Sequence, residues 1–346
     1  MTGTNCLYFY GIIHNDYPSV LFSELTKFGL EVISYEEVSA IVAKKDYIDL
    51  TDSGKETLAR LLVEHQKVLE QVMTLGLDRL IPMKLGTWAK DQAEVSKILG
   101  KGYALCMDIL GKVRDMVEVD VAVTWTHFDR LIQTVADDPE VKEFKTQLMA
   151  KGQVSVADQM QIGKIIREKL RKKSESAGIS IIKQLDPVCQ QLKQHELMDD
   201  QMIVNSAFLV DRGKITLFEE MLDQLDRDFQ GELNFKYVGP LPCYSFYTLE
   251  VVELSFKEIE QARNILGLNI KASARDIRQA YHTKVKSAHP DVRSAEKDET
   301  DFTALSKAYH VVNDYMKTFG KLSEEDLCCF SEEKVAENSL LVKIRE

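Results

Sequence analysis

Strand-type and helix-type hydrophobic patterns alternate along residues 1–254, and this alternation limits the fold more than any other feature of the chain. The apolar run 6–13 and the apolar–polar alternation at 117–125 predict strands, because side chains in a strand repeat every two residues. Residues 55–75 and 91–116 carry apolar side chains at steps of three and four, which predicts two long helices. Helices interleaved with strands in this order favour an α+β fold, with helices on one face of a mostly antiparallel sheet.

The order of these patterns resembles a ferredoxin-like unit, and a similar order returns after residue 117. A helical pattern at 126–199 comes first. It is followed by predicted strands at 202–210, 233–238 and 244–252 and by a predicted helix at 215–229. We therefore predict two ferredoxin-like α+β units with long helices, at 1–116 and 117–254, and the strand near 117–125 could belong to both. An exposed edge strand in either unit could extend the sheet of a partner, and the sequence does not select one edge.

The rest of the chain is a basic segment followed by an acidic tail. Residues 255–322 contain 12 basic and 9 acidic side chains, a net charge of +3, whereas 323–346 contain 3 basic and 7 acidic side chains, a net charge of −4. A basic segment in an acidic protein favours an acidic partner for that segment. The chain as a whole carries −11, which argues against nonspecific binding to nucleic acid. The tail has apolar residues among its charges, and we expect a short helix that packs back on the body.

The tripeptide His289-Pro290-Asp291 lies between two helix-type patterns of the basic segment. Before it, Ser273 and Asp276 fit a capping box at the start of a helix. After it, an apolar stripe continues at Phe302, Leu305, Tyr309, Val312 and Met316. Two such patterns predict an antiparallel helical hairpin with the tripeptide in its exposed loop.

This arrangement resembles the J-domain (DnaJ-like) family, the module that recruits Hsp70 chaperones. The resemblance implies a small all-α J-domain-like helical hairpin at 255–322, with 323–346 as a separate C-terminal tail. It also implies that the loop and the basic helix before it contact Hsp70. The residues concerned are His289, Pro290, Asp291, Arg275, Arg278, Lys284 and Lys286. Val292 stands where a lysine is usual and no fourth helix is evident, so a hairpin used only for docking is the alternative.

Three segments of residues 1–254 resemble the gas vesicle protein GvpL/GvpF family. They are 7–13 (LYFYGII), 80–87 (LIPMKLGT) and 239–246 (GPLPCYSF). Leu85, Leu241 and Cys243 depart from the residues usual in that family. The matching positions are Tyr10, Gly11, Pro82, Gly86, Gly239, Pro240, Pro242, Tyr244 and Phe246.

This second resemblance implies a role in the assembly of gas vesicles, the protein-walled compartments used for buoyancy. It implies an accessory protein or minor shell component that binds the small hydrophobic shell protein GvpA, and other gas vesicle proteins as further partners. The J-like segment could then bring Hsp70 (DnaK) to the same client. The alternative is a general J-domain cochaperone unrelated to gas vesicles.

No pattern points to catalysis, so we do not expect an enzyme. The seven histidines form no metal-binding spacing, and no phosphate-binding or nucleophile motif is present, so neither a metal nor a cofactor is expected. We interpret His65 as a residue of a polar helix face. Six cysteines without a zinc pattern indicate a reducing cytoplasm, and the GvpL/GvpF resemblance implies the gas vesicle as a further location. The absence of a long apolar run predicts no lipid-membrane partner, and the net charge of −11 predicts no nucleic-acid partner.

Overall fold

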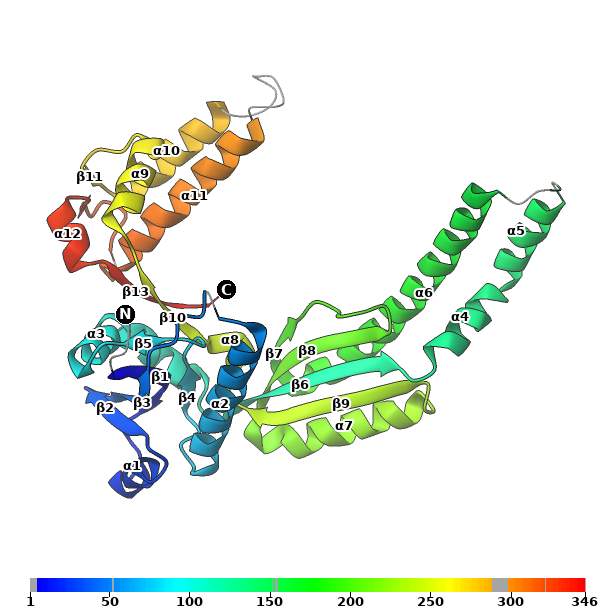
Figure 1. Cartoon of the computed structure of the whole chain (residues 1–346), viewed down its shortest axis with the longest axis horizontal. Coiled ribbons are helices and arrows are strands. Elements are labelled where there is room, and N and C mark those ends of the chain that lie inside the picture. Colours follow the sequence, from blue (N-terminus) through cyan, green and yellow to red (C-terminus); the bar gives the residue numbers. More distant parts are fainter. Residues whose placement is uncertain are drawn as a thin grey trace. The chain divides into compact units, whose positions relative to one another are not determined.

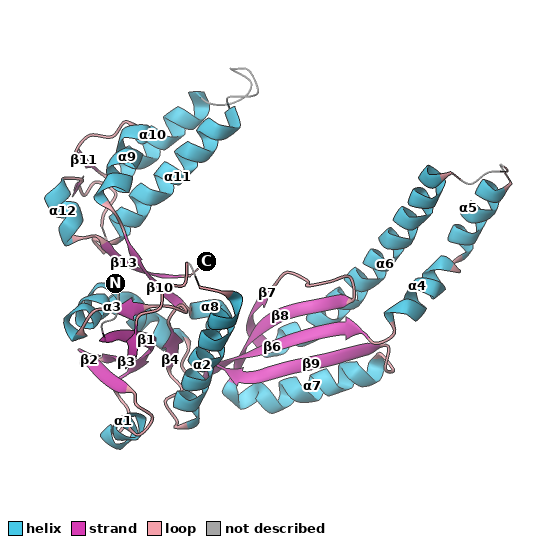
Figure 2. Cartoon of the chain, viewed as in Figure 1, coloured by secondary structure: helices cyan, strands magenta, loops and turns pink. Residues whose placement is uncertain are grey.

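The computed structural model describes residues 5–51, 53–150, 152, 155–287, 298–320 and 322–345. They form two compact units, one of Met1–Gly111 with Tyr247–Glu346 and one of Lys112–Phe246. Helices and strands are both abundant, which confirms the α+β class (Figure 2). The four-part division at residues 116, 254 and 322 stays a prediction.

The first unit contains an antiparallel sheet with a ferredoxin-like strand order, β2-β3-β1-β4. Its elements are β1 (Asn5–His14), α1 (Ser19–Thr26), β2 (Glu31–Tyr35), β3 (Val38–Asp46), α2 (Lys55–Thr74), β4 (Leu80–Pro82), β5 (Trp88–Ala89) and α3 (Gln92–Lys112). β1 is central, pairing with β3 on one side and with β4 and β5 on the other. Every residue of β1 from Cys6 to Ile13 is buried, as its unbroken apolar sequence predicts.

The second unit repeats this strand order as β7-β8-β6-β9. Its elements are β6 (Met116–Trp125), α4 (Phe128–Ala136), α5 (Pro139–Met149), α6 (Val156–Leu185), β7 (Cys189–Gln194), β8 (Met202–Asp211), α7 (Ile215–Asp228), β9 (Leu233–Leu241) and α8 (Tyr244–Tyr247). Short 3-10 turns at Asp186–Val188 and Arg212–Lys214 precede β7 and α7. Helices α4 and α5 and the N-terminal part of α6 form an arm that extends from the end of this sheet (Figure 1), whereas Ala177, Ile181 and Leu185 of α6 pack in the core of the sheet.

Three local predictions are wrong in this part of the chain. Among the described residues, β6 pairs with β8 and β9 of the second sheet alone, so it is not shared between the units. β7 lies inside the region predicted to be helical, because its polar sequence CQQLKQ gives no strand-type alternation at a sheet edge. The strand predicted at 244–252 is interrupted, since residues 244–247 form the helical turn α8 and the strand β10 (Leu249–Glu253) begins after it.

The C-terminal helices form their own apolar core within the first unit. Their elements are α9 (Phe256–Leu266), β11 (Lys271–Ala272), α10 (Ala274–Ser287), α11 (Asp298–Lys317), β12 (Cys328–Cys329), α12 (Glu332–Glu337) and β13 (Leu340–Ile344). The core includes Ile259, Ile277 and Tyr315, whereas Phe302 from the predicted stripe is 50% exposed.

The tail contains a strand where we expected only a short helix. β13 pairs antiparallel with β10, from Leu249↔Ile344 to Glu253↔Leu340. Leu341 joins the core of the C-terminal helices. On α3, a Cβ placed on Gly102 would lie 2.9 Å from Val342 Cγ1, so the tail strand also packs tightly against the N-terminal part of the unit. No helix within the described residues has the length and apolar character needed to cross a membrane.

Candidate functional site

The first two family-like segments lie next to each other in the first sheet. Tyr10 accepts a hydrogen bond at its carbonyl oxygen from the Met83 N–H, at 2.9 Å, and Gly11 pairs with Pro82. A Cβ on Gly11 would lie 2.8 Å from Leu80 Cδ1 and 2.9 Å from the Ile81 carbonyl oxygen, so only glycine allows this close approach. Gly86 adopts φ +81°, and a side chain there would collide with Leu50. These residue types are therefore explained by packing.

A buried polar cluster lies beside these segments. Tyr8 Oη accepts a hydrogen bond from the Gly86 N–H at 3.3 Å and lies 2.8 Å from His65 Nδ1. The ammonium group of Lys45 lies 5.3 Å from the centre of the Tyr8 ring and forms an ion pair with Glu64. His65 is 3% exposed, so its assignment to a polar helix face is wrong. Burial lowers the pKa of His65 to about 4, which keeps the ring neutral at pH 7.

The third family-like segment is anchored on a buried carboxylate of β6. Ser245 donates two hydrogen bonds to Glu118, from its N–H to Oε2 at 2.8 Å and from Oγ to Oε1 at 2.8 Å. A Cβ on Gly239 would lie 3.0 Å from the Glu118 carbonyl oxygen, which favours glycine at this position. The Gly239–Pro240 peptide bond is cis. Pro242 is buried, whereas Tyr244 and Phe246 are half-buried in α8.

The polar residues around Glu118 form a second cluster that the sequence did not reveal. His195 Nε2 lies 3.3 Å from Ser245 Oγ, and Lys193 Nζ donates to the Ser245 carbonyl oxygen at 2.9 Å. Burial raises the pKa of Glu118 to about 8, against the lowering effect of its hydrogen bonds to Ser245. Burial also raises the pKa of the neighbouring Asp120. The alternation in β6 predicts both carboxylates on a solvent face, but segment 239–246 covers Glu118.

The C-terminal helices bring together most of the residues of the J-like prediction. Ser273 and Asp276 form the expected capping box, with the Ser273 N–H 2.8 Å from Asp276 Oδ2 and the Asp276 N–H 3.2 Å from Ser273 Oγ. The rings of Tyr281 on α10 and Tyr309 on α11 stack with centroids 4.3 Å apart. Gly267 ends α9 in the left-handed region, at φ +72°. His289, Pro290 and Asp291 lie outside the described residues.

Acidic residues of the tail contact the basic face of α10. Arg278 forms an ion pair with Glu324 at 2.6 Å, and Arg275 lies 3.8 Å from Glu325. The Arg275 N–H also donates to the Glu324 carbonyl oxygen at 3.2 Å. Lys284 bonds to the Ile265 carbonyl oxygen, so its ammonium group is turned toward α9. Of the four predicted basic contacts, three thus have neighbours within the chain, and Lys286 is exposed.

Comparison with known proteins assigns the larger part of the chain. The family model described as gas vesicle synthesis protein GvpL/GvpF matches residues 6–248. The chain belongs to the GvpL/GvpF family. Gas vesicle protein F of Nostoc sp. is 26% identical over 243 residues, which cover 69% of this chain and 97% of that protein. Gas vesicle protein F of Dolichospermum flosaquae is 25% identical over 248 residues, covering 70% and 98%.

This GvpL/GvpF protein also carries a DnaJ domain, matched at residues 261–318. Chaperone protein DnaJ of Mycoplasma mobile is 42% identical over 53 residues, which cover 15% of this chain and 14% of that protein. Both resemblances drawn from the sequence are confirmed. The chain is therefore a gas vesicle accessory protein with a J-domain.

Solved structures agree on the fold of the GvpL/GvpF part. The crystal structure of GvpF from Anabaena sp. has a TM-score of 0.61 and 23% identity, covering 71% of this chain and 99% of that one. GvpF from Microcystis aeruginosa has a TM-score of 0.56 and 21% identity, covering 71% and 100%. The roles predicted for individual residues in binding stay predictions. Within the described ranges, no group of histidine, cysteine and carboxylate side chains is arranged to hold a metal ion.

Proposed function

We propose that this GvpL/GvpF protein binds the small hydrophobic shell subunit GvpA and delivers it to growing gas vesicles, as an assembly factor or minor shell component. We further propose that its DnaJ domain recruits Hsp70 (DnaK) to the same client. The observation that carries the proposal is the presence of both family matches in one chain. A shell subunit exposes apolar surface and strand edges before it is assembled, which makes it a suitable chaperone client.

The connection between the parts supports joint action on one client. Strand β10 leads into the DnaJ domain, and β13 returns from it to pair with β10. Lys343 on β13 lies 3.0 Å from Asp314 of α11 and 3.7 Å from Glu250 of β10. The DnaJ domain is therefore held at both ends on the first unit, and the same chain carries both this domain and the proposed GvpA-binding part.

Two measurements on the full chain test the two halves of the proposal. Co-expression with GvpA followed by pull-down should capture the subunit, and the purified protein should stimulate Hsp70 ATPase activity. His289→Gln should abolish the stimulation and leave GvpA capture unchanged. Absence of GvpA capture, with ATPase stimulation intact, would instead favour the general J-domain cochaperone. Absence of stimulation by the unaltered protein would reject Hsp70 recruitment.

A further inference from the structure

Strand β9 forms an open edge of the second sheet. It is nine residues long and, among the described residues, pairs only with β6. The other edge strand, β7, has six residues. From residue 234 to 240, every position of β9 except the half-buried Phe235 is exposed, including Tyr237 at 42% and Val238 at 57%. Tyr237 and Val238 point to opposite faces, so neither face of this part of β9 is covered, and the pairing with β6 alone leaves the outer edge open among the described residues.

The features that usually protect an edge strand are concentrated at one end of β9. The irregular register with β6 occurs beyond Val238, where Gly239 and Pro240 follow. Between residues 234 and 238, Lys236 is the one charged side chain. Unpaired N–H and C=O groups along such an edge can pair with a strand of another chain.

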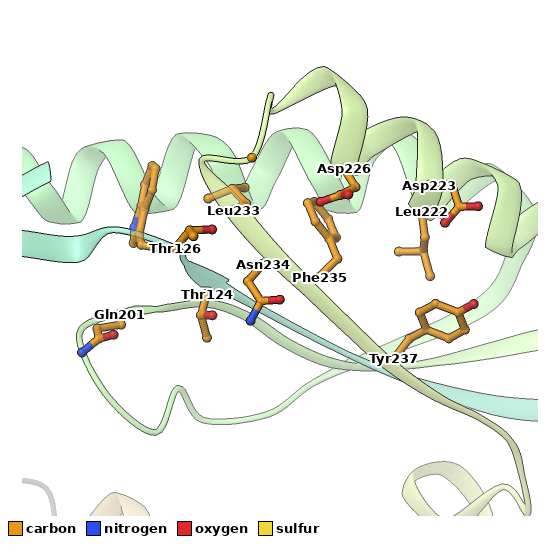
Figure 3. A pocket seen from close by; sticks show the side chains of 12 residues that line it. Thr124, Thr126, Gln201, Leu222, Asp223, Asp226, Leu233, Asn234, Phe235 and Tyr237 are labelled. Atoms are coloured by element: carbon orange, nitrogen blue, oxygen red, sulfur yellow. The ribbon is translucent and has the colours of Figure 1, made fainter. Parts of the chain in front are cut away.

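A pocket of about 590 Å³ lies along this edge (Figure 3). Its lining includes the consecutive residues Leu233, Asn234 and Phe235. Successive side chains of a strand point to opposite faces, so a pocket lined by all three reaches around the edge. Thr124, the partner of Asn234 across the strands, lies on one face, and Leu222 of α7 lies toward Tyr237 on the other (Figure 3).

Two carboxylates of α7 give the pocket its charge. Asp223 and Asp226 line it beside Phe235 and Tyr237 (Figure 3). Both are exposed, and neither forms an ion pair within the described part of the chain. Carboxylates in this position repel phosphate groups and attract a lysine or arginine that arrives next to apolar side chains.

We propose that the outer edge of β9 and this pocket are the docking surface for an extended segment of the shell subunit, which adds to the sheet as a further strand. The segment places a lysine or arginine between Asp223 and Asp226 and apolar side chains against Phe235 and Tyr237. The proposal rests on the proposed binding of GvpA and names the surface that does it. Main-chain pairing supplies affinity, and the carboxylates select the segment and its register.

Charge reversal on α7 tests the side-chain contacts. Full-length Asp223→Lys/Asp226→Lys, co-expressed with GvpA, should capture the subunit roughly tenfold less well than the unaltered chain, because attraction becomes repulsion. The matched control, Glu220→Lys/Asp228→Lys, makes the same change in charge on the same helix but outside the pocket lining, and should capture GvpA normally. Equal capture by all three proteins would overturn the surface and leave GvpA binding itself intact.

Hydrogen exchange of the unaltered complex tests strand addition without any variant. Amides of β9 should exchange roughly tenfold more slowly when GvpA is bound, while those of β7, the opposite edge, stay unchanged. Protection of β7 alone, or reduced capture by the charge-reversed protein without any protection of β9, would reject strand addition at this edge. If the unaltered chain captures no GvpA, the proposed function and this inference both fail.

Discussion

The two antiparallel sheets share one strand order but differ in what lies between their first two strands. In the first unit, the eight-residue helix α1 makes this connection; in the second, α4, α5 and the 30-residue α6 do. The sheets also bury opposite kinds of titratable group. The first encloses His65 in its neutral form, whereas the second encloses Glu118. The shared topology therefore determines the path of the chain, whereas the insertions between strands and the buried titratable side chains differ between the two sheets.

The largest expected effect tests whether the two units are independent. Phe9 and Phe208 are fully buried in the first and second sheets, so replacing either with alanine should cost about 3–5 kcal/mol in the free energy of unfolding of its own unit. Trp88 reports on the first unit and Trp125 on the second, so single-tryptophan versions can follow each unit during urea unfolding. If Phe9→Ala shifts both signals equally, the units unfold as one.

Because Glu118 is buried, we expect the second unit to lose stability as the pH rises. Between the ordinary glutamate pKa and the raised value of about 8, the folded chain keeps a proton that the unfolded chain has lost. Unfolding monitored by Trp125 should show a decrease of about 3 kcal/mol from pH 5 to pH 8. Glu118→Gln should flatten this dependence, and Glu220→Gln, at an exposed site on α7, should not. An unchanged slope in Glu118→Gln would contradict the assignment.

Because His65 is buried, we expect the first unit to lose stability as the pH falls. Because burial lowers the pKa of His65 to about 4, its stability contribution is complete above the ordinary histidine pKa. As the pH falls from about 6.5 to 4, this contribution should be lost. The free energy of unfolding of the first unit, followed by Trp88 fluorescence, should then decrease by about 2 kcal/mol. His65→Gln should remove this loss while the exposed control His310→Gln retains it. If unfolding followed by Trp88 and by Trp125 depended on pH in the same way, the proposed difference between the two units would be wrong.

The smallest expected effect on stability concerns the tail and the DnaJ domain. The ion pairs of Arg275 and Arg278 with Glu325 and Glu324 are exposed, so Glu324→Gln/Glu325→Gln should change unfolding by less than about 1 kcal/mol. The same variant frees the basic face of α10 and should strengthen Hsp70 stimulation at low salt. Glu332→Gln/Glu333→Gln removes the same charge from α12 and serves as the control. Equal stimulation by both variants would mean that the tail does not compete with Hsp70.

Local sequence patterns were sufficient to predict the elements that are stabilised by residues close together in the chain. The apolar periodicity of α2 and the interactions of Ser273 with Asp276 involve residues a few positions apart, so both were predictable from the sequence. The unbroken apolar run of β1 likewise predicted a buried strand. Family motifs added the two domain assignments, because they reflect many positions at once.

Long-range packing decided the rest. β7 and β13 are strands because β8 and β10 supply their hydrogen bonds, and neither partner can be recognised from the short sequence of the strand itself. Glu118 and His65 belong to patterns typical of exposed polar positions, and they are buried because Ser245 and Tyr8, 127 and 57 residues away, close over them. The sequence by itself determined the α+β class and the family, while tertiary contacts decided which strands pair, which edge stays open and which charges are enclosed, because pairing and burial depend on segments distant along the chain.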